Sequence, residues 1–73
     1  MDKNNITLFA IEYLKTHTMI DEIILQKYIK ERPEIDKVIP IEDIQLALDD
    51  AYRRGLIIFV FSDETRTIYS LNL

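Results

Sequence analysis

The sequence predicts a small α+β domain in which three helices are followed by a C-terminal β-hairpin. The main observation is a change of apolar period across Gly55, the only glycine of the chain. Residues 44–52 carry apolar side chains at helical spacing, whereas residues 56–61 form an unbroken run of β-branched and aromatic side chains, which is typical of a strand. Glycine readily adopts the left-handed conformation in which helices often end. At 73 residues and 48% apolar content, the chain is expected to form one domain around one core.

The first helix is expected over residues 5–16. Apolar side chains recur there at i, i+3, i+4 and i+7, a spacing that places them on one face of a helix. Asn4 or Asn5 is the expected N-cap, because an asparagine side chain accepts a hydrogen bond from the free amides of the first turn. A break is expected at residues 17–18, where this pattern stops.

A second helix is expected between a short extended piece at residues 19–20 and Pro33. Asp21 or Thr18 is the expected cap of this helix. Pro33 stops it because the proline ring clashes with a continuing helix and disfavours helical dihedral angles in the preceding residue. The apolar stripe of the helix is expected to consist of Ile23, Ile24 and Tyr28, with Leu25 and Ile29 as further candidates.

The third helix is expected over residues 41–54, after an eight-residue connection, residues 33–40, whose aliphatic side chains are expected to pack on the core. Pro40 suits the first turn, where its missing amide costs nothing, and acidic residues there favour the helix dipole. The side chains expected to face inward are Ile44, Leu48, Ala51 and Tyr52. The outer face is then mostly acidic and consists of Glu42, Asp43, Leu46, Asp49, Asp50 and Arg53.

The hairpin is expected to pair residues 56–61 with residues 66–73 across a polar turn. With a two- or four-residue loop, Phe61 faces Arg66 and Ile58 faces Tyr69. One face then carries Leu56, Ile58, Val60, Tyr69 and Leu71. The opposite face carries four apolar side chains, Ile57, Phe59, Phe61 and Ile68. They are expected to form a contact surface, unless the first helix or the N-terminus covers them or the register differs by one residue.

The formal net charge is −4, and no segment of the chain is net basic. Proteins that bind phosphate usually concentrate positive charge in a patch. Charge therefore disfavours nucleic acid as a partner. The basic residues that could still gather into a patch are Lys27, Lys30, Lys37, Arg53, Arg54 and Arg66. The alternative is that they pair with nearby acids, as Asp49 and Asp50 would with Arg53 and Arg54 at helical spacing.

No motif for catalysis, metal binding or cofactor binding is recognised, and an enzyme is not expected. The chain has no cysteine, and its single glycine excludes a glycine-rich phosphate loop. His17 is expected to lie at a helix end in a surface or capping role, and Ser62 and Ser70 have no base nearby in the sequence. No apolar run approaches the roughly 18 residues of a membrane helix, and residues 1–5 lack the basic start of a signal peptide. We therefore expect no membrane association and a cytoplasmic location.

The chain resembles the winged helix-turn-helix superfamily in its order of elements and in two patterns of core and turn residues. These patterns are Leu-x-x-Ala-x-x-x-Gly-Leu-Ile at the helix–strand junction and Tyr-Ser-Leu in the last strand. The matching positions are Leu48, Ala51, Gly55, Leu56, Ile57, Tyr69 and Leu71. The resemblance covers nearly the whole chain and indicates no particular family. It implies a third helix that enters a DNA major groove and a hairpin, the wing, that lies along the backbone or minor groove.

Two features separate this chain from the DNA-binding pattern of that superfamily. The connection before the third helix is longer than the three or four residues of a helix-turn-helix. The outer face of the third helix is acidic, and carboxylates lose the counterion-release contribution that dominates DNA affinity. The composition, which leans towards isoleucine, asparagine and lysine, suggests an AT-rich bacterial or phage genome.

The favoured function is therefore protein–protein interaction, as a regulator or inhibitor, of nucleic-acid-mimic type, of a protein of transcription or another DNA transaction. The expected interface residues are Asp43, Leu46, Asp49, Asp50, Ile57, Phe59, Phe61 and Ile68. A second copy of the chain is the other candidate for a protein partner. The alternative function is a dimeric DNA-binding transcriptional regulator that uses residues 41–54 and the wing at residues 56–73.

Overall fold

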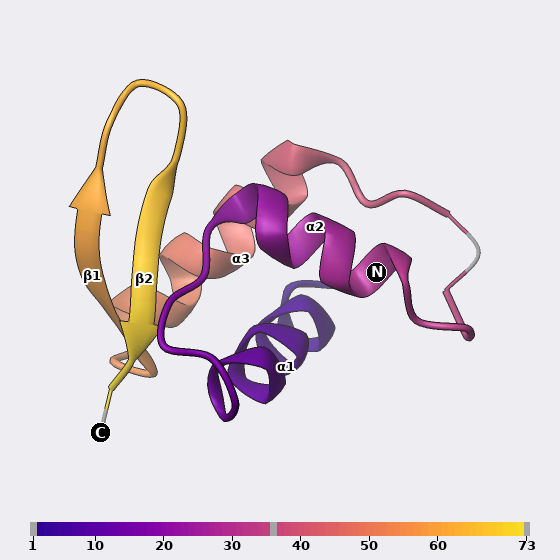
Figure 1. The fold of residues 1–73 in the computed structure, drawn as a ribbon, viewed down its shortest axis with the longest axis horizontal. Coiled ribbons are helices and arrows are strands. Elements are labelled where there is room, and N and C mark those ends of the chain that lie inside the picture. Colours follow the sequence, from indigo (N-terminus) through magenta and orange to yellow (C-terminus); the bar gives the residue numbers. More distant parts are fainter. Residues whose placement is uncertain (1, 36, 73) are drawn as a thin grey trace.

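The computed structural model describes residues 2–35 and 37–72 and contains three helices followed by an antiparallel hairpin, as the sequence predicts (Figure 1). The elements are α1 (Lys3–Leu14), α2 (Glu22–Lys30), α3 (Ile41–Arg53), β1 (Ile57–Ser62) and β2 (Thr67–Leu71). This layout is consistent with a small winged helix. Residue 36 of the predicted connection and residue 73 of the predicted second strand lie outside the described residues.

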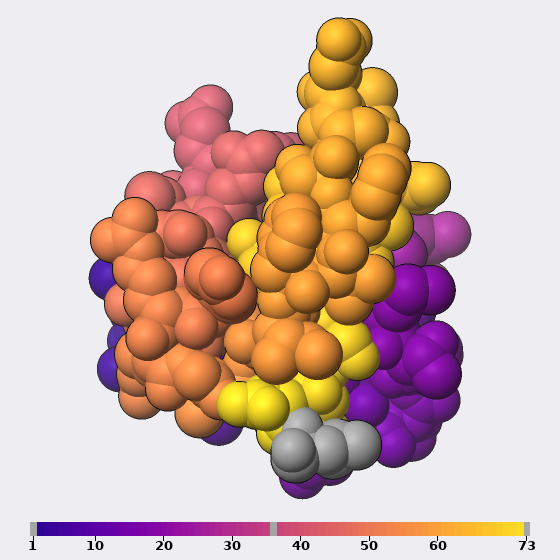
Figure 2. Space-filling model, turned by 90° about the vertical axis from the view of Figure 1, so that its left-hand side faces the viewer, coloured from indigo at the N-terminus to yellow at the C-terminus, as the bar shows by residue number. Residues whose placement is uncertain are grey.

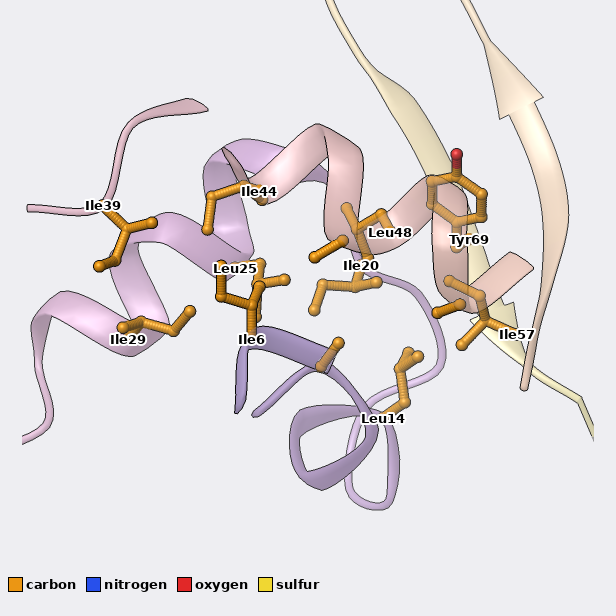
Figure 3. Close-up of a cluster of buried hydrophobic side chains, with 13 residues drawn as sticks. Ile6, Leu14, Ile20, Leu25, Ile29, Ile39, Ile44, Leu48, Ile57 and Tyr69 are labelled. Atoms are coloured by element: carbon orange, nitrogen blue, oxygen red, sulfur yellow. The ribbon is translucent and has the colours of Figure 1, made fainter. Parts of the chain in front are cut away.

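The core lies between the three helices and reaches the base of the hairpin (Figure 3). Each element contributes aliphatic side chains to it, and Tyr69 closes it on the side of β2. The buried apolar residues are Ile6, Ala10, Leu14, Ile20, Leu25, Ile29, Ile39, Ile44, Ala47, Leu48, Ala51, Ile57 and Tyr69.

Helix α1 begins earlier than the sequence predicts, because Asp2 is its N-cap. An Asp2 carboxylate oxygen accepts a hydrogen bond from the backbone N–H of Asn5 at 3.0 Å. Asn4 and Asn5, the predicted caps, therefore lie inside the first turn. An aspartate at this place also offers negative charge to the positive end of the helix dipole, which a neutral asparagine does not.

Helix α2 is capped by Asp21, as predicted, with its carboxylate 2.8 Å from the N–H of Ile24. The predicted stripe is wrong for two residues, because Ile23 and Ile24 are 59% and 37% exposed. The cap at Asp21 fixes where the helix starts, and the inward face then falls on Glu22 and, at i+3 and i+7, on Leu25 and Ile29.

The connection between α2 and α3 packs on the core through Ile39, which is buried, and Ile35, which is partly buried. The side-chain amide of Gln26 on α2 donates to the Ile39 carbonyl at 2.7 Å. Val38 does not share this packing and is 53% exposed. The prediction for this segment therefore holds for two of its three aliphatic residues.

Helix α3 ends at the predicted glycine through a Schellman motif. Gly55 has a φ of +77°, its N–H donates to the carbonyl of Tyr52, and the N–H of Leu56 donates to the carbonyl of Ala51. The prediction that Tyr52 points inward is wrong, because its side chain is 47% exposed. It lies at the edge of the core, with its ring centroid 6.2 Å from that of Tyr69.

The register of the hairpin differs from the predicted one. Phe59 pairs with Tyr69 and Phe61 with Ile68, with an irregularity between the two pairs at Val60. The turn also lies one residue further along than predicted, because the Asp63 carboxylate accepts hydrogen bonds from the backbone N–H groups of Thr65 and Arg66.

This register divides the predicted contact surface between the two faces of the sheet. Directly paired residues share a face, so Phe61 and Ile68 lie on the outward face, with Ile58 and its partner Ser70. Ile57, predicted to be exposed, faces the core and is 1% exposed. A shift of the pairing by one residue moves every side chain of a strand to the other face of the sheet. This shift is the reason that the sequence wrongly predicts Ile57 to be exposed and Ile58 to face the core.

Candidate interaction surfaces on the hairpin and helix α3

Strand β1 is the most apolar exposed element of the described chain. Its first residue, Ile57, is buried, but the next four, Ile58 to Phe61, are 44–50% exposed. The hairpin extends beyond the helices, so these side chains have no helix to pack on (Figure 2). Of the predicted hairpin interface residues, Phe59 and Phe61 are therefore exposed, Ile68 is partly exposed and Ile57 is not available. Ile58 and Val60 are not among the predicted interface residues, because the predicted register places them on the core face.

The outer edge of β1 is unpaired within the described residues, because β2 lies between β1 and the extended segment at Ile20. Ile20 and Tyr69 exchange two backbone hydrogen bonds of 2.9 Å, so both polar backbone groups of Tyr69 point away from β1. In an antiparallel pair, a residue opposite such a position also points its N–H and C=O outward. Phe59 is that residue.

Ile57 is the second residue of β1 with outward-pointing backbone groups. The N–H of Asn72 donates to the carbonyl of Leu56 at 3.3 Å, which makes these two residues a hydrogen-bonded pair. Pairs alternate along the ladder, so Ile58 also bonds to β2, whereas the N–H and C=O groups of Ile57 and Phe59 point away from it. Ile57 is 1% exposed and is therefore covered, so of these two residues only Phe59 lies open at the free edge. Figure 2 shows this edge facing the viewer.

The exposed face of α3 carries an apolar side chain among acidic ones. Leu46 is 61% exposed and is the largest apolar side chain on this face. Residues three and four positions away on a helix are its neighbours. All four of these neighbours are acidic: Glu42, Asp43, Asp49 and Asp50. The structure therefore places the four predicted α3 interface residues on one face.

The last two of these acids are tied to basic residues, as the sequence predicts. Asp49 lies 3.0 Å from Arg53 and Asp50 lies 3.6 Å from Arg54, both at i, i+4 spacing. Lys3 of α1 adds a second contact to Asp50 at 3.6 Å. These pairs are largely exposed, so each contributes only a few tenths of a kcal/mol. They neutralise charge at the C-terminal end of α3 and leave Glu42 and Asp43 as exposed carboxylates at its start.

The predicted basic residues do not gather into one patch. Lys30 and Lys37 line one small hollow at the end of α2, on the side of the molecule opposite the hairpin (Figure 1). Arg53 and Arg54 are paired at the end of α3. Arg66 lies at the base of the wing turn, 3.7 Å from the carboxylate of Asp21. Lys27 is exposed on α2.

Two acids at the start of α2 hold the hairpin against the helices, and sequence analysis missed this role. Glu22 is 4% exposed, and its carboxylate accepts the backbone N–H of Thr67 at 2.8 Å. Asp21 is 4% exposed and contacts Arg66 in addition to capping α2. The position of the first residues of β2 is thus fixed from outside the sheet.

A shallow hollow of about 560 Å³ separates this contact from the end of α1. Tyr13, Met19, Ile24, Arg66 and Ile68 are among the residues that line it, so it continues the outward face of the sheet. His17 also lines it, stacked on Tyr13 with the ring centroids 3.9 Å apart and Nδ1 3.1 Å from the Tyr13 carbonyl.

The side chains considered for chemistry are separated in the structure. The Ser62 hydroxyl contacts the Thr67 hydroxyl, and the Ser70 hydroxyl donates to the carbonyl of Thr18. Within residues 2–35 and 37–72, no group of three or more histidine, cysteine, aspartate or glutamate side chains is placed to hold a metal ion. In the same part of the chain, every helix is too short or too polar to cross a membrane.

In comparisons with known proteins, no protein-family model, curated protein or solved structure matches the chain.

Proposed function

We propose that this chain is a small acidic protein of the winged-helix type that acts by protein–protein interaction. It docks the exposed face of α3 on a basic surface of a partner and thereby regulates or inhibits that partner. Concentrated basic surfaces are typical of proteins that bind nucleic acid. The partner class that fits is therefore a protein of transcription or another DNA transaction, with α3 occupying the place of the nucleic acid. The proposal requires no cofactor and no catalytic step.

The single observation that supports it is the position of Leu46 among four carboxylates. An exposed apolar side chain with charged neighbours has the anatomy of a small interface, in which an apolar anchor is desolvated inside a polar rim. Asp49 and Asp50 of this rim are paired with Arg53 and Arg54, so its uncompensated charge lies at Glu42 and Asp43. These two carboxylates attract a basic surface over a distance of about one Debye length and orient the encounter. Leu46 leaves most of its apolar area exposed in the isolated chain, so that area is free to be buried by a partner.

Direct DNA binding is the alternative function, and charge disfavours it. In a winged helix that reads DNA, α3 and the wing would meet the phosphates. On this chain those two elements present Glu42 and Asp43 on one side and Asp63 and Glu64 on the other. Repulsion from phosphate would outweigh the contribution of the paired Arg53 and Arg54.

The first experiment separates these two functions. Light scattering follows the mass of the purified chain as mixed-sequence duplex DNA is added at low salt. We expect no complex with DNA. A complex that forms and is lost reversibly as salt rises would overturn the proposal and support the DNA-binding regulator.

The second experiment tests the docking face itself. A photocrosslinking amino acid is incorporated in place of Leu46 in cells that naturally express the protein. The matched control carries the same amino acid in place of Leu8, which is 64% exposed on α1. We expect one crosslinked partner from position 46 and none from position 8. The crosslink should be lost when Asp43→Asn and Asp49→Asn are added, because the acidic rim is then halved.

Two results would contradict the proposal. One is a partner that crosslinks equally from Leu46 and Leu8, and the other is a crosslink that persists after the acidic rim is neutralised.

A further inference from the structure

We propose that two copies of this chain associate through the outward faces of their sheets, with Phe61 of each copy seated in the hollow of the other, about a two-fold axis that runs across the strands. The outward face carries Phe61 and Ile68 and points away from the core. It is separate from the exposed face of α3. The proposal therefore goes beyond the proposed function and does not depend on it.

The outward face extends over three extended segments. Ile20, which pairs with β2, faces the core and is fully buried. Successive side chains of an extended segment point to opposite faces, so Met19 lies on the outward face, where it lines the hollow. Figure 1 shows this segment beside β2. Strand β2 contributes Ile68 to the same face, and β1 contributes Ile58 and Phe61.

This face is apolar, although an antiparallel sheet with one face in water usually carries polar side chains on that face. Met19, Ile58 and Phe61 are 44–50% exposed. Ile68 is partly exposed between them on β2. A contiguous exposed apolar patch of this kind marks a contact surface, because single exposed apolar residues are common but groups of them are not.

The face carries both a protruding side chain and a hollow that can receive one. Phe61 is 50% exposed on a hairpin that extends beyond the helices. The hollow of about 560 Å³ is lined in part by Tyr13, Met19, Ile24 and Ile68. Such a lining suits an aromatic ring, which makes edge contacts with tyrosine and sulfur contacts with methionine. Because both features lie on one face, that face is complementary to itself, as a two-fold interface requires.

Charge selects the direction in which the two faces pack. Two further hollows continue the first one along β2, one at the wing turn beside Asp63 and one at the end of α1 beside Lys15. Glu64 adds a second acid to the wing turn. An axis across the strands places the wing turn of each copy over the α1 end of the other, so opposite charges meet, whereas an axis along the strands would bring like charges together. Figure 1 shows that the wing turn and the end of α1 lie at opposite ends of β2.

Between these two ends, the hollow offers little charge to oppose a second copy. Asp21 and Arg66 line it 3.7 Å apart, so their charges compensate each other. The acids of α3 lie elsewhere, because α3 packs on the core side of the sheet through Tyr52 and Tyr69. The net charge of −4 therefore opposes association through this face less than through α3.

The exposed area indicates how strong this association is. A large apolar side chain offers roughly 200 Å², so Met19, Ile24, Ile58 and Phe61, which are 37–50% exposed, provide on the order of 350 Å² per copy. With the polar share of a usual interface, two copies bury about 1,200 Å² in total. This area is at the low end of stable interfaces, so we expect a weak, reversible dimer with a Kd between about 1 μM and 1 mM.

The first test measures the mass of the unmodified chain by sedimentation equilibrium over a range of concentrations. We expect the mass to rise from 8.7 kDa towards twice that value. A chain that is still monomeric at about 1 mM, where even a Kd of about 1 mM leaves half of the chains in dimers, would overturn the proposal and leave the face to another protein.

The second test compares two aromatic residues of β1 that lie on opposite faces. Phe61→Lys is expected to weaken the dimer more than tenfold, because it places a charge in the apolar hollow of the other copy. The matched control is Phe59→Lys, since Phe59 is 49% exposed but pairs with Tyr69 and shares the core face. Circular dichroism checks that both variants are folded. Equal effects of the two substitutions, or no effect of Phe61→Lys, would contradict the proposal.

The third test needs no variant and therefore holds even if Phe61→Lys fails to fold. NMR follows the methyl signals of the unmodified chain as it is diluted. We expect the signals of Met19, Ile58 and Ile68 to change, and those of Leu8 and Leu46, which are exposed on α1 and α3, to stay constant. Changes at Leu8 or Leu46 in place of the outward face would put the interface elsewhere and overturn the proposal.

The fourth test examines the direction of packing by exchanging charges. Lys15→Glu and Glu64→Lys are each expected to weaken the dimer by about two- to tenfold, because like charges then meet at the ends of the interface. The chain that carries both substitutions is expected to recover the original Kd, since opposite charges face each other again. A double variant that associates no better than the single ones would contradict an axis across the strands.

Discussion

Thr7 is the one described residue that carries a buried hydroxyl without a partner. It lies on α1, is 4% exposed, and its Oγ1 has no hydrogen-bond partner among the described residues. Burial of an unpaired hydroxyl costs free energy that an apolar group of the same shape does not. The residue is thus a local defect in the packing of α1, with no evident role in the exposed face of α3.

We predict that Thr7→Val stabilises the protein by about 1 kcal/mol, because valine fills the same space without a polar atom to desolvate. The two residues have similar helix propensities, so the backbone contributes little to the difference. Urea unfolding followed by circular dichroism measures the change. The control is Thr16→Val, where the hydroxyl is exposed and donates to the Tyr13 carbonyl at 3.3 Å. A loss of stability in Thr7→Val would show that its hydroxyl is satisfied in solution.

Asp63 organises the wing turn and has a lowered pKa. The backbone N–H of Thr65 is the main cause, followed by the Thr65 hydroxyl, and the N–H of Arg66 contributes further. A carboxyl whose pKa is lowered on folding stabilises the folded form above its ordinary pKa of 3.8, and that contribution is lost as pH falls through the lowered value.

We therefore predict that the turn is ordered at neutral pH and loosens in acid below the usual aspartate range. NMR follows the Asp63 carboxyl and the amide protons of Thr65 and Arg66 as pH is lowered. The amide signals should change together with the carboxyl, and Asp63→Ser should abolish the pH dependence. An Asp63 that titrates at or above the ordinary value would refute this account.

At the level of elements, α2 controls where the hairpin lies. The Glu22 carboxylate accepts the N–H of Thr67, which points out of the sheet and would otherwise be unpaired. We predict that Glu22→Ala destabilises the protein by about 1–3 kcal/mol, because it leaves this amide without a partner. Hydrogen exchange should become faster throughout β2, and unfolding in urea measures the total.

Glu31→Ala is the matched control for this effect. Glu31 is an exposed acid at the other end of α2, and its removal is expected to change stability by less than about 0.5 kcal/mol. Equal losses in the two variants would mean that Glu22 acts through the charge of α2 and not through its contact with β2.

Elements that depend on local signals could be predicted from the sequence, and elements that depend on pairing could not. The stop at Gly55 and the cap at Asp21 follow from the conformational preferences of single residues, and both are confirmed. The register of the hairpin depends on how Asp63 folds the turn and on an extra residue at Val60. Neither has a local signal strong enough to fix it, so Ile57 and Ile58 were placed on the wrong faces.

The exposed face of α3 and the outer edge of β1 differ in the same respect. The acidic face of α3 could be identified from the sequence, because helical spacing alone places Leu46 among its four acidic neighbours. The free edge of β1 could not, since it depends on which strand lies in the middle of the sheet. That order is set by the contact between Ile20 and Tyr69, two residues far apart in the chain.

For the whole molecule, the longest run of exposed apolar side chains, Ile58 to Phe61, lies on β1 and contains no charged residue. On α3, the exposed Leu46 instead has acidic side chains as its neighbours. The two elements thus offer different chemistry to a partner: β1 offers uncharged apolar area, and α3 offers one apolar side chain inside an acidic rim.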